Sequence, residues 1–211
     1  MTRFRLMAAA LCAITLALAA PAEAPPFDYY MLSLSWAPDF CALPGGNKDP
    51  KECSPGRRLG FVVHGLWQQM EQGRAKDDCG SSPVAESLVG VMLRYIPTES
   101  LIQHEWKTHG SCSGLSSQDY FALVRKARDG VKIPASLTSI SAEESQDAAQ
   151  IESQFAAANP TYPKDAFRAT CYREGTLQEV RICFDKDLKA RACTNSAGGC
   201  RTGAMKILPP R

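Results

Sequence analysis

The cysteine content constrains this 211-residue chain most: eight cysteines follow residue 24, and a ninth, Cys12, precedes it. In an exported protein an even number of cysteines indicates a disulfide framework, here of four bridges. A cysteine zinc site would instead use closely spaced CxxC pairs, and no two of these cysteines lie that near each other. We therefore predict four disulfides among the following residues: Cys41, Cys53, Cys79, Cys112, Cys171, Cys183, Cys193 and Cys200.

Export is expected from residues 1–24. Two arginines open this stretch, an apolar run over 6–20 follows, and alanines at 22 and 24 frame a small-residue cleavage site, which is the pattern of a secretory signal peptide. The alternative is a membrane anchor, but the run is shorter than the roughly 20 apolar residues that a span needs. We expect cleavage after Ala24 and a secreted or periplasmic protein without a membrane partner.

The segment 25–211 is long enough for one domain with its own apolar core, so disulfides would reinforce a fold that burial already supports. Without two arginines and one glutamate in 1–24, the formal charge changes from +2 to +1. Tight, sequence-blind binding of nucleic acid needs many phosphate contacts, which a near-neutral chain does not offer. The few phosphate contacts that an enzyme makes remain compatible with this charge.

Strand patterns lie at both ends of this segment, and helical patterns lie between them. Apolar runs that alternate or are punctuated by glycine predict strands, a 3.6-residue period predicts helices, and a proline- and glycine-rich stretch predicts a loop. Strands are expected over 28–36 and 57–67, with a loop between them that Cys41 and Cys53 close. Helices are expected over 82–96, from Thr98 into 101–112, over 117–129 and over 141–158. Two further strands are expected within 166–185, joined at Glu174 and Gly175. This order predicts an α+β domain.

The stretch LIQHEWKTHGSC (101–112) holds two of the three histidines. It differs from the zinc signature HExxH because three residues separate Glu105 from His109, and histidines five positions apart are turned about 140° from each other on a helix. We therefore expect no metal site here. On a helix Glu105 and His109 would stack at i and i+4, with His104 about 100° away, so the three face one broad side.

The remaining histidine, His64, lies near the end of the apolar run FVVHGLWQ. Alone it would be a core residue with satisfied hydrogen bonds, but three histidines in two short motifs indicate a site. Two imidazoles with pKa values near 6.5 can act as base and acid in one step, and a nearby carboxylate and cation can stabilise a phosphorane-like charge. RNA supplies its own 2′-hydroxyl nucleophile, so such an enzyme needs neither a covalent residue nor a metal.

FVVHGLWQ and HEWKTHGSC resemble the two active-site segments of the ribonuclease T2 family, approximately FxxHGLWP and HEWxKHGxC, and LSLSWAPDFC is similar to that family's first strand. The resemblance implies a ribonuclease T2-like single catalytic domain over 25–211, with a central antiparallel sheet, helices packed alongside and four disulfides. It also implies an endoribonuclease that needs no cofactor or metal. Such an enzyme cleaves single-stranded RNA to 2′,3′-cyclic phosphate ends with low base specificity, and we expect a monomer.

The resemblance also assigns roles to single residues. His64 and His109 match the acid and base pair, with His109 as the base toward the 2′-hydroxyl, and Glu105 matches the carboxylate that helps polarise the phosphate. Three positions are expected to contact substrate: His104 at the phosphate, Trp67 stacked on a base, and Lys107 beside the family's lysine position. The implied disulfide pairs are Cys41–Cys53, Cys79–Cys112, Cys171–Cys200 and Cys183–Cys193.

Two positions depart from the family pattern: Thr108 replaces the usual lysine and Gln68 replaces the usual proline. Lys107 is turned about 100° from position 108, so it can replace that lysine only if the helix end is irregular. Arg57 or Arg58 is the other candidate cation.

Two other classes of function compete with this assignment. A secreted binding module on the same fold, with weakened catalysis, should have lost the acid and base first, yet His64, His104, Glu105 and His109 are all present. A metal-dependent nuclease or phosphatase would need clustered carboxylates beyond Glu105.

Overall fold

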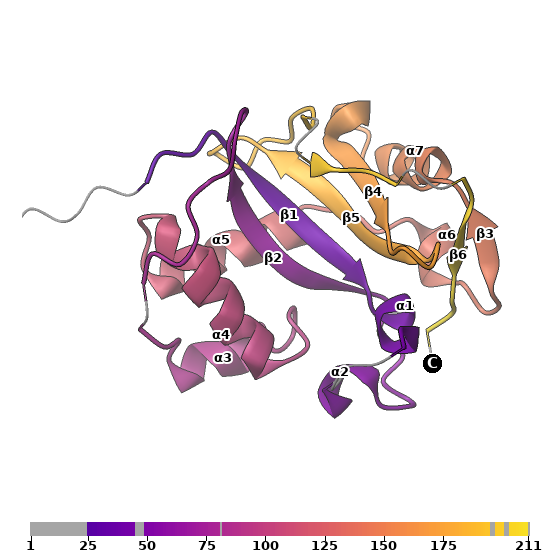
Figure 1. Ribbon diagram of the computed structural model, residues 1–211, viewed down its shortest axis with the longest axis horizontal. Helices are drawn as coiled ribbons and strands as arrows, with labels where there is room; N and C mark the ends of the chain where they lie inside the picture. Colours follow the sequence, from indigo (N-terminus) through magenta and orange to yellow (C-terminus); the bar gives the residue numbers. More distant parts are fainter. Residues whose placement is uncertain (1–24, 45–48, 81, 195–196, 201–202, 211) are drawn as a thin grey trace, which may run out of the picture.

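The structure, a computed structural model, describes residues 25–44, 49–80, 82–194, 197–200 and 203–210. The predicted signal peptide lies outside these residues. Four strands form an antiparallel sheet in the order β2-β1-β5-β4, and two short strands pair separately (Figure 1). The strands are β1 (Tyr29–Trp36), β2 (Phe61–Gln69), β3 (Glu144–Gln146), β4 (Phe167–Cys171), β5 (Leu177–Phe184) and β6 (Met205–Ile207).

Helices flank both edges of the sheet: α4 contacts β2 at one edge, and α7 contacts β4 at the other (Figure 1). The helices are α1 (Ala37–Ala42), α2 (Pro50–Cys53), α3 (Glu86–Met92), α4 (Glu99–Thr108), α5 (Ser117–Asp129), α6 (Ala135–Thr138) and α7 (Ala148–Ala158), with the 3-10 turns η1 (Gly110–Cys112) and η2 (Lys164–Ala166). The predicted α+β class with a central antiparallel sheet is therefore confirmed.

The two faces of β1 have different neighbours, because side chains along a strand alternate in direction. Leu32 and Leu34 belong to the main core, together with Phe121 of α5 and Phe155 of α7. Each such side chain stabilises the fold by about 1.5–3 kcal/mol when it leaves water. The other face carries Met31, Ser33 and Ser35 in alternation, and this face of the sheet is the one that bears the site described below.

Several predicted elements are confirmed with their caps. Helix α5 begins after Ser116, whose hydroxyl accepts from the Asp119 N–H, and it ends at Gly130. Helix α4 begins after Thr98, which accepts from the Leu101 N–H in the same way. The strands predicted within 166–185 are β4 and β5. The strand predicted over 57–67 lies over 61–69, and the helix predicted over 82–96 is shorter, at 86–92.

Two predictions are wrong. The segment between the first two strands was expected to be a loop, but it contains α1 and α2, each with a proline in its first turn, where a missing N–H costs nothing. The helix expected over 141–158 begins only at 148, because Asp147 and Gln150 form a capping box. Residues 144–146 instead form β3 with the distant β6.

All four implied disulfides are present: Cys41–Cys53, Cys79–Cys112, Cys171–Cys200 and Cys183–Cys193. The second of them spans 33 residues and joins the segment after β2 to the turn η1 that follows α4. Within the described residues, no helix combines the length and the apolar character that crossing a membrane requires.

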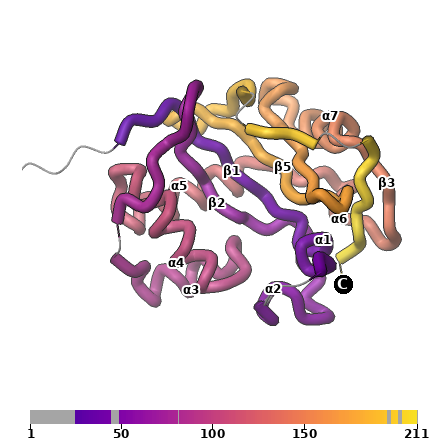
Figure 2. The backbone as a smooth tube through the Cα atoms, viewed as in Figure 1, coloured from indigo at the N-terminus to yellow at the C-terminus, as the bar shows by residue number. Residues whose placement is uncertain are grey.

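Asp39 joins three distant segments. It is 1% exposed, and its carboxylate accepts hydrogen bonds from the backbone N–H groups of Leu177 and Leu208, both at 3.0 Å. The indole N–H of Trp36 donates to the Leu208 carbonyl at 3.0 Å. Figure 2 shows the C-terminal segment, in yellow, running beside β3 toward α1. Burial raises the pKa of Asp39 to about 6.

We expect Asp39→Asn to destabilise the fold by about 1–3 kcal/mol, because an amide offers one acceptor oxygen where two N–H groups need acceptors. Because the folded carboxyl holds its proton more tightly than the unfolded one, its titration adds to the stability of the wild type. This added stability is fully present below the unfolded pKa and is lost as the pH rises through the folded pKa of about 6. Chemical denaturation should therefore show a larger difference from wild type near pH 4 than near pH 7. A difference that grows toward pH 7 would contradict this interpretation.

Candidate active site

A bulge in the sheet positions His64. Ser33 of β1 lies opposite Gly65 of β2, but Leu34 lies opposite Val63, so His64 is the extra residue of β2. A bulge turns one side chain out of the regular alternation, and such features recur beside active sites. The imidazole is 34% exposed, on a strand whose neighbouring positions 63 and 65 are buried.

The imidazole of His64 lies between two buried carboxyl groups. Its Nδ1 is 2.6 Å from Oε1 of Glu179 on β5, and its Nε2 is 3.7 Å from Oε1 of Glu105 on α4. The two carboxyl side chains are only 2% and 1% exposed. Residues from two strands and one helix therefore meet at this ring.

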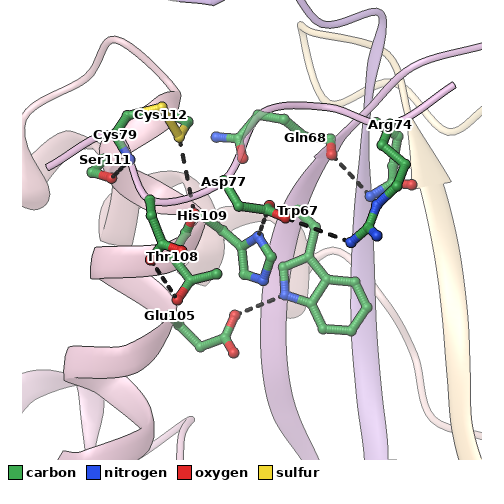
Figure 3. Close-up of polar contacts among 12 residues, drawn as sticks. Trp67, Gln68, Arg74, Asp77, Cys79, Glu105, Thr108, His109, Ser111 and Cys112 are labelled. Atoms are coloured by element: carbon green, nitrogen blue, oxygen red, sulfur yellow. Dashed lines mark hydrogen bonds and ion pairs between the residues drawn. A yellow bond between two sulfur atoms is a disulfide. The ribbon is translucent and has the colours of Figure 1, made fainter.

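Glu105 is also bound to Trp67, whose indole N–H donates to its Oε2 at 2.7 Å (Figure 3). Gly65 makes this contact possible, because a Cβ there would lie 2.0 Å from that oxygen and 2.3 Å from the indole nitrogen. The other oxygen, Oε1, has no hydrogen-bond partner within the described part of the chain. The carboxyl group is thus held at one oxygen and left available at the other.

His109 is the C-cap of α4, and its backbone N–H donates to the backbone carbonyl of Glu105 at 3.0 Å. Its Nδ1 is 3.2 Å from Oδ1 of Asp77, and Figure 3 shows Asp77 between His109 and Arg74. Trp67 contacts both imidazoles: its ring centroid is 5.0 Å from that of His64 and 5.5 Å from that of His109. The two histidines therefore share one aromatic neighbour.

The surroundings shift the pKa values of the two histidines in opposite directions. Burial alone would lower the pKa of His64, but the hydrogen bond and charge of Glu179, with the charge of Glu105, raise it above its ordinary value. Burial lowers the pKa of His109, and the charges of His104 and His64 add to this, against the opposing effect of Asp77. His64 thus favours the charged form and His109 the neutral form.

The pKa of Glu105 also differs from that of an ordinary carboxyl group. Burial raises its pKa to about 7, against the lowering effects of the His64 charge and the Trp67 hydrogen bond. A substantial fraction of this carboxyl group is therefore protonated near neutral pH, and a protonated carboxyl can donate a hydrogen bond as well as accept one.

Two hollows lie beside these groups. One has a volume of about 380 Å³ and contains Trp67 and His109 together with Met31, Arg74, Asp77 and Arg181. The other, of about 330 Å³, contains His64 and Glu179 together with Ser35, Phe40, Leu101 and Tyr172. The imidazole pair therefore has a concave surface on each side, which suits a ligand that extends in two directions.

The structure brings together four of the six predicted site residues: His64, Trp67, Glu105 and His109. His104 is exposed on α4, yet its charge is near enough to lower the pKa of His109. Lys107 is exposed, and its substrate contact stays a prediction. Helix α4 ends at Thr108, and the chain continues through His109 into the 3-10 turn η1, so Lys107 lies in the last turn of the helix.

The sequence analysis missed Asp77, Glu179 and Arg181. They lie in a connecting segment and on a strand that carried no recognised motif, and only the tertiary structure brings them to the histidines. Arg57 and Arg58, the other predicted cations, line a separate hollow beside Cys41–Cys53. The described residues contain no group of three or more histidine, cysteine, aspartate or glutamate side chains arranged for a metal ion.

The fold and site define an α+β protein with paired imidazoles beside a buried carboxyl group. The model of the ribonuclease T2 family matches residues 27–193. A ribonuclease of Aeromonas hydrophila is 38% identical over 122 residues, which cover 58% of this chain and 54% of that protein. A probable ribonuclease of Haemophilus influenzae is 34% identical over 181 residues, which cover 80% and 61%. The chain belongs to the ribonuclease T2 family.

The fold agrees with this membership. The crystal structure of RNase NT in complex with 5′-AMP has a TM-score of 0.67 to this chain at 21% identity, over 87% of this chain and 99% of that one. The match to the two curated relatives above spans less than two thirds of their lengths, at 54% and 61%.

We expect Gly65→Ala to break the contact between Trp67 and Glu105, because the added methyl group overlaps both side chains. Overpacking of this kind costs about 1–3 kcal/mol in unfolding free energy. The indole N–H signal of Trp67 in an NMR spectrum should move as its hydrogen bond is lost. Gly90→Ala in α3 is the matched control, since a Cβ there meets nothing within 4 Å; an equal effect of the two substitutions would refute the steric argument.

Proposed function

We propose that this chain is an endoribonuclease that cleaves single-stranded RNA by transphosphorylation and leaves 2′,3′-cyclic phosphate ends. One observation supports this reaction above the others: two imidazoles with opposite pKa shifts contact the same tryptophan, and this tryptophan donates a hydrogen bond to the buried carboxyl group of Glu105. An acid and a base poised in opposite protonation states are what a concerted proton transfer needs. Family membership supports the same reaction.

In the proposed step, neutral His109 removes the proton from the 2′-hydroxyl, and the 2′-oxygen attacks the phosphorus. The bond from phosphorus to the 5′-oxygen of the next nucleotide breaks. Charged His64 gives its Nε2 proton to that leaving oxygen, because its Nδ1 is directed at Glu179. The number of protons is balanced: His109 gains one and His64 loses one.

Glu105 stabilises the phosphate in this proposal. Its Oε1 lacks a hydrogen-bond partner within the described residues and lies 3.7 Å from Nε2 of His64, where the leaving group would be protonated. With its pKa raised to about 7, the carboxyl can keep a proton and donate a hydrogen bond to a non-bridging oxygen, without transferring that proton. A preorganised donor at the point where charge develops is typically worth about 3 kcal/mol of barrier.

The proposed substrate contacts are Trp67, His104 and Lys107. A base stacked on Trp67 would gain roughly 1–3 kcal/mol with little discrimination among bases, which supports low base specificity. Since Thr108 offers no charge, Arg74 and Arg181 in the hollow beside His109 are the cations that we assign to the RNA backbone. No cofactor or metal enters the proposed reaction.

We also propose that residues 1–24 direct export and are removed, and that the remaining domain acts as a monomer in a periplasm or outside the cell. The four disulfides support this location, because such bridges persist in oxidising compartments.

Purified protein should cleave single-stranded RNA in the presence of EDTA, and mass spectrometry of short digestion times should find 2′,3′-cyclic phosphate ends. His64→Ala and His109→Ala should each lower kcat by about 10²–10⁴, because each removes one proton-transfer group. A pure binding module would cut nothing, and a metal-dependent nuclease would stop in EDTA. Either result, or full turnover in one of the two variants, would reject the proposal.

The pH profile of kcat/KM should be bell-shaped around the ordinary imidazole pKa near 6.5. The acid limb follows His109, whose pKa is lowered, and activity there falls as His109 becomes protonated. The alkaline limb follows His64, whose pKa is raised, together with Glu105, whose pKa is about 7, and activity there falls as these groups lose their protons. Initial rates across the range test this. A single limb, or an optimum at a pH where both imidazoles are neutral, would exclude the assigned pair.

A further inference from the structure

We propose that Glu179, held in place by Arg181, is a positioning residue that sets the orientation and proton location of the His64 imidazole. The proposal rests on the proposed function only where it concerns turnover, since the contact itself belongs to the folded protein without substrate. It adds a residue on β5 to a site that the two sequence motifs place on β2 and α4.

The contact fixes which nitrogen of His64 carries a proton in the neutral ring. A carboxylate can only accept, so Nδ1, at 2.6 Å from Oε1 of Glu179, must be the donor. Nε2 is then left toward Glu105 on the other side of the ring. The ring is therefore oriented so that Nε2, the nitrogen that donates its proton in the proposed reaction, points toward the position of the phosphate. Carboxylate partners of this kind orient histidines in many sites.

Arg181 fixes the carboxylate in turn. Its Nε donates to Oε2 of Glu179 at 2.9 Å, and its Nη1 donates to the Ala197 carbonyl at 2.8 Å. Glu179 is 2% exposed, and a buried charge needs partners of this kind to be tolerated. Burial alone would raise its pKa, but the hydrogen bonds and charges of His64 and Arg181 lower it to about 2. Glu179 is therefore charged throughout the working range of the enzyme.

Small side chains on β1 allow the contact between Glu179 and His64. β1 lies between β5 and β2, so Glu179 reaches His64 across β1. The β1 residues opposite Glu179 and Arg181 are Ser35 and Ser33, both small. Glu179 and Arg181 are two positions apart and share one face of β5. Small residues on the central strand thus give the long side chains of its neighbour access to the far strand.

Other charged groups also face His64. Glu105 lies at Nε2 and His109 lies across Trp67, while Glu52 and Tyr172 line the hollow that contains His64 and Glu179. Glu105 is partly protonated near neutral pH, so it holds the imidazolium less firmly than a permanent carboxylate does. Glu179 is the group whose charge is present at every pH at which His64 titrates.

The test is Glu179→Gln, which keeps the shape and an acceptor oxygen but removes the charge. NMR titration of the folded protein without RNA should show the pKa of His64 falling by about 1–3 units, the usual effect of one adjacent opposite charge. With RNA, kcat should fall roughly 10- to 100-fold with little change in KM, and the alkaline limb of the pH profile should move to lower pH with the His64 titration.

The matched control is Glu152→Gln. Glu152 also pairs with an arginine, Arg168, and accepts from a backbone N–H, but it lies on α7 away from the histidines. It should leave the His64 titration and the pH profile unchanged. If Glu179→Gln fails to fold, the charge-retaining Glu179→Asp variant replaces it: its shorter carboxylate loses the 2.6 Å contact, and a smaller fall in the same two quantities is expected.

An unchanged His64 titration in Glu179→Gln, or an increased KM with full kcat, would overturn the positioning role. The two proposals fail separately. A protein that cuts no RNA but shows the lowered His64 pKa in the variant would refute the ribonuclease assignment and keep the contact. A protein that cuts RNA normally, with an unchanged His64 titration in the variant, would keep the ribonuclease assignment and refute the positioning role of Glu179.

Discussion

The site depends on the close approach of α4 to β2 at Gly65. Because this residue has no side chain, the Glu105 carboxyl can reach the indole N–H of Trp67, and the two sequence motifs become one hydrogen-bonded unit. Trp67 then contacts both imidazoles, so the spacing between His64 and His109 follows from the packing of one helix on one strand. A glycine is required here by space and not by backbone conformation.

Partial burial acts differently on the pKa values of the two histidines. Burial lowers the pKa of each, and the difference comes from the partners: Glu179 is nearly inaccessible to water, whereas Asp77 is 36% exposed. Water screens the exposed carboxylate, so it offsets burial at His109 only in part, while the buried one reverses it at His64. Two chemically identical side chains in one site thereby acquire the opposite protonation preferences that the proposed acid and base roles require.

Local sequence patterns and motifs were sufficient to predict one part of the structure. The α+β class, the helix over 117–129 and the cysteine pairs were predicted from periodicity, caps and a family resemblance, and His64, Trp67, Glu105 and His109 lie together as expected. The partners of the histidines were not predicted, because Glu179 reaches His64 across a central strand and Asp77 lies in a segment without regular secondary structure, and neither has a signal in local sequence. β3 was missed for the same reason, since its strand partner among the described residues is β6, 59 positions or more away in sequence.

Thr108 lies where the segment after β2 is attached to the end of α4. Its hydroxyl lies 3.4 Å from Oδ1 of Asp78, and its carbonyl accepts from the Asp78 N–H at 2.8 Å. The next residue, Cys79, is bonded to Cys112 and donates its N–H to Ser111. These contacts fasten the 77–79 segment to the end of α4, and this attachment brings Asp77 to His109. The backbone hydrogen bond and the disulfide carry this attachment, and the threonine hydroxyl adds one long, exposed hydrogen bond to it. In the proposed reaction, the cationic charge that a lysine would have supplied comes from Arg74 and Arg181, which line the same hollow as His109.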